Sequence, residues 1–372
     1  MMSVNTLLIT ASAIIGFELA DNKALATSPL AIQFLLTMLS TIPASLFMRR
    51  YGRKSGFMLS SILGMSGSLI AIAAVIQHSF LLFCFSTALF GIYTGFGNYF
   101  RFVAVEVAPP KHQHTAISYV LAGGVLAAVI GPNLANHSKD MFETMYLGSF
   151  IAVFILYFLN MINLALIDMP KPINQALNDQ IRSVTEIIRQ PVFLVAMISA
   201  AIGFSMMSLL MTATPLAMKH AHHSFSDVAF VIQWHVLGMF APSFFTGHLI
   251  NRFGVTRIIS LGAWFMLACI AINLFGTTMP HFWFALFFLG LGWNFMFIGG
   301  TTMLTGTYNE AEKAKAQAIN DFVVFTMVTL ASLSAGILQY QLGWQMVNIS
   351  VIPFILFSLL AILWLNYRKQ NN

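Results

Sequence analysis

A chain of 372 residues that is 58% hydrophobic and only 8% charged does not have the composition of a water-soluble domain, in which about a quarter of residues are charged. The net charge of +6 does not indicate nucleic-acid binding, because the basic residues stand at the ends of apolar runs. Composition therefore excludes a soluble enzyme and indicates an integral membrane protein, since buried charges are costly in lipid.

Apolar runs of the length needed to cross a bilayer recur along the chain, and polar or basic turns separate them. About 20 residues of helix span roughly 30 Å, the hydrocarbon thickness of a bilayer. The runs predict an all-α integral membrane protein with twelve transmembrane helices, near residues 2–20, 28–48, 56–76, 80–107, 113–136, 144–167, 191–217, 226–250, 257–276, 280–306, 314–338 and 345–367. The long polar segment 170–190 predicts a linker, partly an amphipathic surface helix.

The distribution of basic residues predicts the orientation of these helices. Fourteen of the 18 basic residues lie in the even-numbered turns, the linker and the C-terminal tail, whereas only Lys23, Lys139 and Lys219 lie in the odd-numbered turns. Arg101 lies within a predicted helix. Because basic residues accumulate on the cytoplasmic side, both termini are expected in the cytoplasm.

Two basic turns indicate an internal repeat. Arg50-Tyr51-Gly52 follows the second helix, and Arg252-Phe253-Gly254 follows the eighth, 202 positions later. The same shift places Ala116-Ile117 on Ala318-Ile319. We therefore expect two pseudo-symmetric halves of six helices each, in residues 1–169 and 191–372, joined by the linker 170–190. In transporters built from such repeats, the binding site lies near the membrane midplane and alternating access opens it to either side.

The chain resembles the major facilitator superfamily over its whole length. The family carries the motif Gly-x-x-x-Asp-Arg-x-Gly-Arg-Arg between helices 2 and 3, which Arg50, Gly52, Arg53 and Lys54 match here. Gly247, Arg252 and Gly254 match it in the second half. The family's leading glycine is Ser45 in the first half, and its Asp is Arg49 in the first half and Asn251 in the second.

The resemblance implies that these turns belong to a cytoplasmic gate. The implied gating residues are Arg50, Gly52, Arg53, Arg252 and Gly254. The family's Asp acts partly through the positive N-terminal end of helix 11, which would repel Arg49. We expect other pairs to hold this gate, with Glu106 as the counter-ion of Arg50 or Arg53. The alternative is that the basic turns only set topology.

Polar residues on one face of the fourth helix are candidates for substrate contact. Thr94, Asn98 and Arg101 recur at three- and four-residue spacing, so they share a face. Such a face in a membrane must turn toward the bundle or a cavity, and the resemblance implies that helices 1, 4, 7 and 10 line it. Arg101 favours an anionic or zwitterionic solute. The alternatives for Arg101 are a structural ion pair with Glu106 or Asp321, or snorkelling to the interface.

Further candidates lie in the second half. Gln233, His235, Asn294 and Thr301 are expected to contact substrate. Asp321 and His235 are the candidates for proton coupling, because an intramembrane carboxylate is costly without a task and histidine titrates near neutral pH. A lone buried histidine is otherwise a hydrogen-bonded core residue.

These features predict a secondary active transporter of a small organic solute, coupled to a proton gradient, monomeric and multi-pass in the bacterial inner membrane. Drug or metabolite efflux by proton antiport is an alternative, to which the 35 phenylalanines and the six second-half tryptophans also point. A non-transporting sensor is a more distant one. No span carries the paired groups of an intramembrane enzyme. The cluster His220, His222 and His223 lacks the partners of a metal site, so we expect neither metal nor cofactor.

Overall fold

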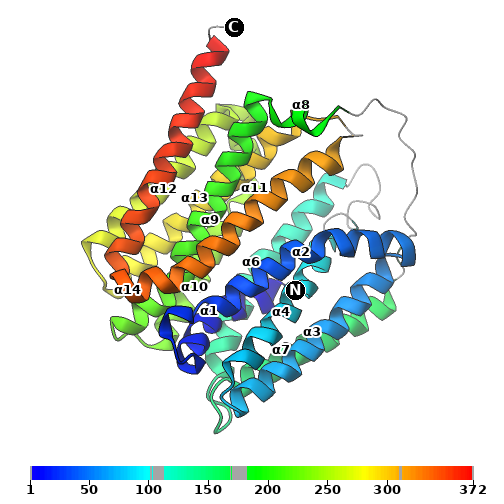
Figure 1. Ribbon diagram of the computed structural model, residues 1–372, viewed down its shortest axis with the longest axis vertical. Helices are drawn as coiled ribbons and strands as arrows, with labels where there is room; N and C mark the ends of the chain where they lie inside the picture. The colour runs from blue at the N-terminus through cyan, green and yellow to red at the C-terminus, as the bar shows by residue number, and fades with distance from the viewer. Residues whose placement is uncertain are drawn as a thin grey trace. The chain divides into compact units, whose positions relative to one another are not determined.

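The computed structural model describes residues 2–100, 103, 113–167, 169, 182–309 and 312–370. Helices and the turns between them make up this part of the chain (Figure 1). It divides into two compact units, one of residues 1–174 with 223–233 and the other of residues 175–222 with 234–372. The helix Phe225–Phe240 (α10) contributes to both units.

Six further α-helices of the first unit lie among the described residues. They are α1 (Met2–Leu19), α2 (Ser28–Tyr51), α3 (Arg53–Ile76), α4 (Phe80–Gly97), α6 (Gln113–Ser138) and α7 (Leu147–Leu166). Helix α4 packs between α2 and α3, α1 packs on α6, and α7 packs on α3. None of the large hydrophobic residues that are highly exposed belongs to α1, so this helix is enclosed by its neighbours.

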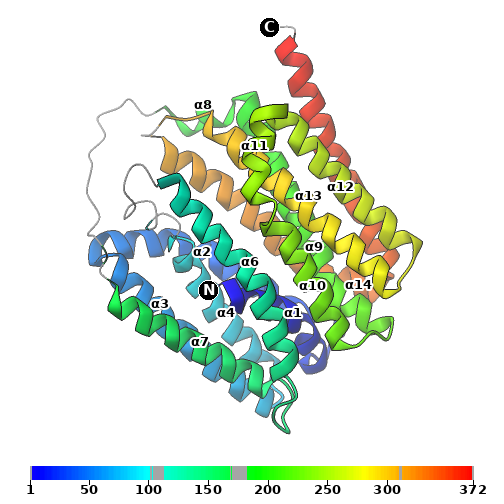
Figure 2. The same ribbon diagram turned by 180° about the vertical axis from the view of Figure 1, so that it is seen from behind.

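The second unit is built around α9 (Pro191–His220), which packs on α13 and α14 (Figure 2). Its other helices are α8 (Val184–Ile188), α11 (Ser243–Phe253), α12 (Val255–Phe275), α13 (Met279–Thr305) and α14 (Lys313–Gln370). Helix α9, like α1, carries no highly exposed large hydrophobic residue. It is therefore the inner helix of its unit.

Nine described helices are long and apolar enough to cross a bilayer, or ten if the bent pair α10–α11 is one span. That count treats α14 as a single helix of 58 residues, about 87 Å at 1.5 Å per residue. However, Gly343 breaks α14 with a φ of 77° and a ψ of 174°, and the chain turns sharply there (Figure 1). Each arm of α14 is long enough to cross a bilayer. The total of twelve stays a prediction.

One predicted helix needs correction, and another is described only in part. The eighth predicted helix, 226–250, is two helices, because the chain bends by 43° between α10 and α11 at Ala241-Pro242. Proline lacks the N–H that would continue the helical ladder. Of the fourth predicted helix, 80–107, the structure describes α4 to Gly97, where the N–H of Asn98 donates to the carbonyls of Thr94 and Phe96. A turn at Asn98 and Tyr99 follows, and Phe100 and Val103 are again helical; the other residues from 101 to 107 lie outside the described residues.

The two basic turns have the same backbone geometry. Gly52 has φ 89° and ψ 156°, and Gly254 has φ 88° and ψ 145°. The N–H of each donates to the carbonyl four residues earlier, Met48 at 3.0 Å and Ile250 at 2.8 Å. This positive φ favours glycine, which lacks the Cβ that clashes there. The repeat seen in the sequence therefore holds at the level of backbone dihedral angles.

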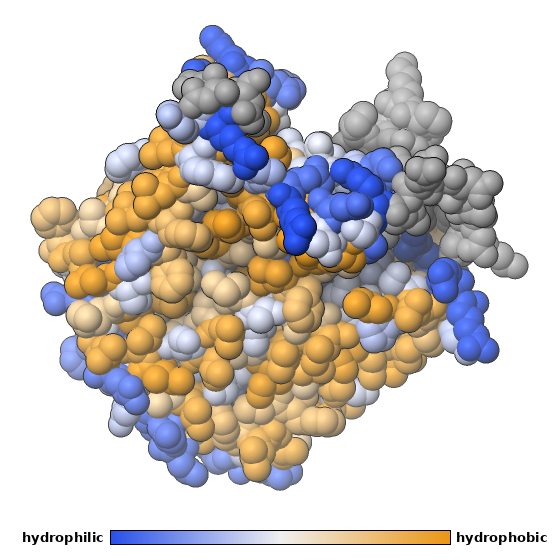
Figure 3. Space-filling view, turned by 45° about the horizontal axis from the view of Figure 1, so that its top comes forward, coloured by the Kyte–Doolittle hydropathy of each residue, from blue (hydrophilic) through white to orange (hydrophobic). Residues whose placement is uncertain are grey.

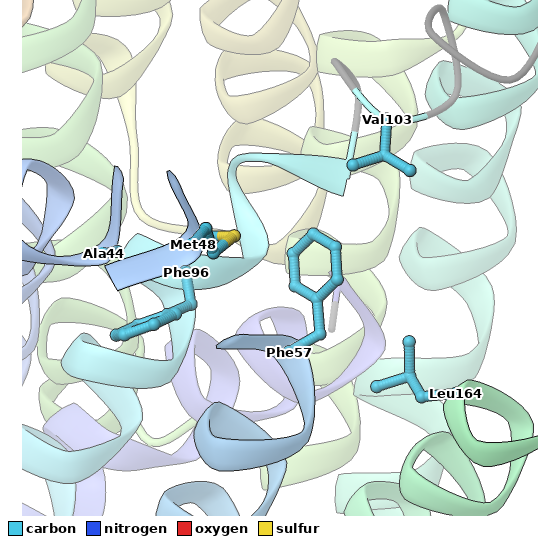
Figure 4. Close-up of a cluster of buried hydrophobic side chains, with 6 residues drawn as sticks. All are labelled: Ala44, Met48, Phe57, Phe96, Val103 and Leu164. Atoms are coloured by element: carbon cyan, nitrogen blue, oxygen red, sulfur yellow. The ribbon is translucent and has the colours of Figure 1, made fainter. Parts of the chain in front are cut away.

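A matching apolar cluster backs each turn. Met48 packs in a buried cluster with Ala44, Phe57, Phe96, Val103 and Leu164 (Figure 4). Ile250, 202 positions after Met48, packs with Ile258 and Phe295. Burial of these side chains fixes the direction in which the chain leaves each turn.

Apolar side chains cover most of the face seen in Figure 3, and hydrophilic residues gather toward its margins. Highly exposed large hydrophobic residues include Trp264 of α12 and Phe357 and Trp364 of the second arm of α14. A soluble protein rarely exposes so many apolar side chains in contiguous patches. The surface is that of a protein in contact with lipid.

Candidate functional site

A cluster of polar side chains joins three helices of the first unit. The Asn5 carboxamide oxygen of α1 accepts from Gln33 Nε2 of α2 at 3.3 Å and from the Thr94 hydroxyl of α4 at 3.2 Å. Gln33 is 4% exposed, and its Oε1 is buried with no hydrogen-bond partner among the described residues. Because a buried amide oxygen without a donor is costly, this cluster has capacity to accept a further hydrogen bond.

Asn98 continues the Thr94 face of α4. It is half-buried and lies four residues, about 6 Å along the helix, beyond Thr94. Arg101 and Glu106 lie outside the described residues, so their assigned roles stay predictions.

The equivalent helix of the second unit presents aromatic rings instead. Trp293 and Phe297 of α13 stack with ring centroids 5.2 Å apart and planes 13° apart. Phe204 of α9 meets both edge-on, at 5.5 Å and 5.2 Å, and Phe325 of α14 lies 6.0 Å from Phe204. Phe204, Phe297 and Phe325 are half-buried, whereas Trp293 is 6% exposed. We call these four residues the aromatic cluster.

Two predicted site residues lie one helical turn from the aromatic cluster. Thr301 of α13 follows Phe297 by four residues, is exposed and donates to the Phe297 carbonyl at 2.8 Å. Asp321 of α14 precedes Phe325 by four residues, is half-buried and accepts from Asn320 Nδ2 at 3.2 Å. Residues four apart on a helix share a face, so Thr301 lies on the face of Phe297 and Asp321 on the face of Phe325.

His235 and Asn294 occupy helix-packing positions. The His235 side chain is fully buried, and its Nδ1 lies 2.8 Å from the Leu286 carbonyl of α13. The Asn294 side chain is also fully buried; it donates to Met239 O at 2.6 Å and to Ser243 Oγ at 2.7 Å. Its oxygen accepts from Thr246 Oγ1 at 2.6 Å. Both residues hold α13 against α10 and α11, and their roles in substrate contact stay predictions.

Gln233 pairs with the first unit rather than with these residues. Its Oε1 accepts from Asn133 Nδ2 of α6 at 2.6 Å, and both residues cluster with the first unit. Gln233 and His235 therefore have different partners, although both belong to α10 and are only two positions apart in the sequence.

The predicted gating residues keep matched positions. Arg50 lies over the Tyr51 ring and Arg252 over the Phe253 ring, each 5.3 Å from the ring centroid. Arg53 begins α3, directly after Gly52. The next residue, Lys54, connects the start of α3 to α7. Its Nζ donates to the Ala165 carbonyl in the last turn of α7 at 2.8 Å.

An ion pair that the sequence did not reveal joins the linker to the loop before α14. Arg182 Nε and NH2 donate to the two Glu312 oxygens at 2.7 and 2.6 Å, and Arg182 NH2 also donates to the Thr307 carbonyl at 2.9 Å. The Glu312 side chain is fully buried. Hydrogen bonds from Arg182 lower the pKa of Glu312 to about 2, so the pair is charged at neutral pH.

No group of three or more metal-binding side chains occurs among the described residues. Cys84 is half-buried and Cys269 is buried, and both are free. The histidines at 220, 222 and 223 lie at and just after the end of α9. The absence of a metal or cofactor stays an expectation.

Sequence reasoning missed Asn5 and the aromatic cluster. Asn5 is the only amide side chain of α1, a signal that could have been used. Trp293, Phe297 and Thr301 recur at a spacing of four, but aromatic spacing of this kind occurs equally on lipid-facing surfaces. Only the contact with Phe204 of the enclosed helix α9 distinguishes the two cases.

The repeated helix–turn geometry, the apolar surface and the polar and aromatic faces together define a membrane transporter built from a duplicated helical unit. The chain belongs to the Major Facilitator Superfamily, whose family model matches residues 1–233 and 196–372. This confirms the resemblance drawn from the basic turns. It also confirms a transporter rather than an intramembrane enzyme, in a multi-pass membrane protein.

Three similar proteins are informative. The riboflavin transporter RfnT of Brucella anthropi is 39% identical over 360 residues, which are 96% of this chain and 90% of RfnT. The uncharacterized MFS-type transporter YdeG of Bacillus subtilis is 29% identical over 378 residues, with 96% and 87% covered. A bacterial homologue of the human lysosomal transporter Spinster, crystallised in an inward-facing and occupied conformation, superposes with a TM-score of 0.70 at 14% identity, covering 97% and 94%. This last likeness shows the fold.

Proposed function

We propose that the protein is a secondary active transporter of riboflavin or a closely related small solute. The observation that carries this proposal is the 39% identity to a riboflavin transporter over 96% of the chain. The 360 aligned residues extend over both units.

The chemistry of the two faces is consistent with this substrate. Riboflavin is an uncharged molecule with a planar three-ring system, an imide edge and a hydroxylated chain. Aromatic side chains stack on planar rings, and amide and hydroxyl groups pair with an imide or a polyol. The described part of the chain offers aromatic rings at Trp293 and Phe297 and amide and hydroxyl groups at Asn5 and Thr94.

We further propose twelve transmembrane helices with both termini in the bacterial cytoplasm, and transport by alternating access. The bias of basic residues supports this orientation. Asp321 is the proposed coupling residue, because it is a half-buried carboxylate one turn from the aromatic cluster. Protonation would neutralise the Asp321 carboxylate before the conformational change moves this side chain through a low-dielectric environment.

The direct test is uptake of labelled riboflavin. The gene is expressed in bacteria that can neither make nor import riboflavin, and purified protein is reconstituted in proteoliposomes with an imposed pH gradient. We expect growth at low external riboflavin and saturable uptake that unlabelled riboflavin blocks. Failure of both growth and vesicle uptake by folded protein would reject the substrate, and net export from loaded vesicles alone would favour the efflux alternative.

A further inference from the structure

We propose that the aromatic cluster of the second unit is the binding platform for a planar, multi-ring ligand. This inference rests on the proposed function and deepens it, because it assigns the ring system of a flavin to a particular set of side chains. The cluster comprises Phe204, Trp293, Phe297 and Phe325.

The first argument is the position of the cluster in its unit. Aromatic residues in contact with lipid are highly exposed, as Trp264 is at 61% and Phe357 at 55%. Phe204 belongs instead to α9, which has no highly exposed large hydrophobic residue, yet Phe204, Phe297 and Phe325 are not fully covered. The rings of the aromatic cluster are therefore partly open, and they lie against the innermost helix of the unit.

The second argument is ring geometry. The near-parallel Trp293–Phe297 pair is an offset stack, to which a third flat ring can add on the half-buried Phe297 face. Phe204 stands edge-on to both rings, at interplanar angles of 74° and 70°, so it holds the pair in place. A second edge-on contact comes from Phe240 of α10, 5.9 Å from Trp293. The stack is thus fixed from two sides before a ligand binds.

The third argument is an unpaired donor. The Trp293 indole N–H is buried and has no acceptor among the described residues. Buried indole N–H groups usually have a partner, and leaving one unpaired is costly. A ring carbonyl of the ligand would supply an acceptor after a small shift of the indole. Thr301 and Asp321, one turn away, can meet ring N–H or hydroxyl groups at the edge of the platform.

The test measures binding of two probes to full-length protein in detergent, by quenching of flavin fluorescence. Lumiflavin carries the ring system without the sugar-alcohol chain, and riboflavin carries both. Phe297→Ala is expected to weaken both probes by about ten- to a hundredfold, because stacking on one aromatic side chain contributes roughly that factor. Phe297→Tyr keeps the ring and should bind within about threefold of the wild type.

Two controls separate stacking from misfolding. Phe284→Ala makes the same change at an exposed position of the same helix and should leave both affinities unchanged. Phe297→Leu keeps an apolar side chain of similar volume but has no aromatic face. If this variant binds both probes weakly and its thermal unfolding is unaltered, the lost affinity is due to lost ring stacking.

The outcomes distinguish this inference from the proposed function. Wild-type riboflavin uptake together with unaltered probe affinity in Phe297→Ala and Phe297→Leu overturns the platform and leaves the function standing. Lumiflavin binding that depends on Phe297, in a protein that does not transport riboflavin, supports the platform and rejects that substrate. Failure of wild-type protein to bind lumiflavin overturns the platform.

Discussion

Helix α4 of the first unit and helix α13 of the second begin 199 positions apart, at Phe80 and Met279. Each carries a glycine at which an added Cβ would meet the backbone of a neighbouring helix. A Cβ on Gly91 would collide with the Gln33 carbonyl of α2, and a Cβ on Gly290 would collide with the His235 carbonyl of α10. Gly91 and Gly290 are also 199 positions apart, so the two units share this helix crossing.

The next turns of α4 and α13 differ in chemistry. The same shift of 199 places Thr94 on Trp293 and Asn98 on Phe297. In the first unit, the Thr94 hydroxyl of α4 contacts the Asn5 amide of α1. In the second unit, the Trp293 ring of α13 contacts the Phe204 ring of α9. The equivalent helix contact is therefore polar in one unit and aromatic in the other. The two units share their turns and this helix crossing, which hold the fold, whereas the side chains on the next turns of α4 and α13 differ.

The largest expected effect comes from erasing this difference. Trp293→Thr combined with Phe297→Asn places on α13 the side chains that α4 has. We expect riboflavin transport to fall by about a hundredfold or more, because two stacking rings are lost at a typical 1–3 kcal/mol each. Initial uptake rates in proteoliposomes measure this. Uptake near the wild-type rate by a folded double variant would show that the aromatic face of α13 is not needed for riboflavin transport.

Loss of the carboxylate next to the aromatic cluster should separate transport from its driving force. Asp321→Asn is expected to abolish accumulation driven by a pH gradient while preserving exchange of labelled for unlabelled substrate, because the amide cannot release a proton. Asp140→Asn, an exposed carboxylate beside Lys139, is the matched control. Full gradient-driven accumulation by Asp321→Asn would remove this residue from coupling.

Substitution of the two crossing glycines tests whether the units are equivalent in packing. Gly91→Ala and Gly290→Ala should each destabilise the protein by about 1–3 kcal/mol, since the added methyl meets backbone that cannot move aside. Thermal unfolding in detergent measures the effect. Gly247→Ala, which meets nothing within 4 Å, is the control and should be neutral or slightly stabilising. A large loss in only one unit would contradict the shared crossing.

A smaller effect is expected at the polar face of the first unit. Asn5→Ala removes the acceptor shared by Gln33 and Thr94, and hydrogen bonds between membrane helices contribute about 0.6 kcal/mol on average. We expect the KM for riboflavin to rise severalfold with little change in folding. Asn163→Ala, which loses only a bond to the Leu159 carbonyl of its own helix, should leave KM unchanged. Equal behaviour of the two variants would exclude Asn5 from binding.

The smallest effect concerns the Arg182–Glu312 ion pair, which has no counterpart among the hydrogen bonds described in the first unit. The folded-state pKa of Glu312 is about 2, below its ordinary value of 4.5, so the pair stabilises the fold above pH 4.5 and loses this contribution as the pH falls toward 2. Glu312→Gln should lower the Tm modestly and equally from pH 5 to pH 8. The difference from wild type should shrink below pH 4.5, and a difference that persists at pH 2 would refute the assignment.

Several features followed from local sequence rules. Gly52 and Gly254 were predicted to lie in basic turns between apolar helices, and both adopt the positive φ that glycine tolerates. The bend at Pro242 was not predicted, because proline also occurs inside unbroken membrane helices, such as Pro132 in α6 and Pro215 in α9. Asn5 and Phe204 were missed because their significance depends on partners some 90 positions away.

The sequence by itself determined the membrane class, the order of the helices and the duplicated basic turns. These features depend on apolar length, charge and glycine, which are local properties of the chain. Only the tertiary structure decided which of the many phenylalanines and amides cluster as a candidate site. Packing around α1 and α9 turns Asn5 toward Thr94 and Phe204 toward Trp293, and it places His235 and Asn294 within the helix contacts. In a chain that is apolar on every side, hydrophobic periodicity cannot tell the face toward lipid from the face toward a ligand, and only the neighbours of each helix can.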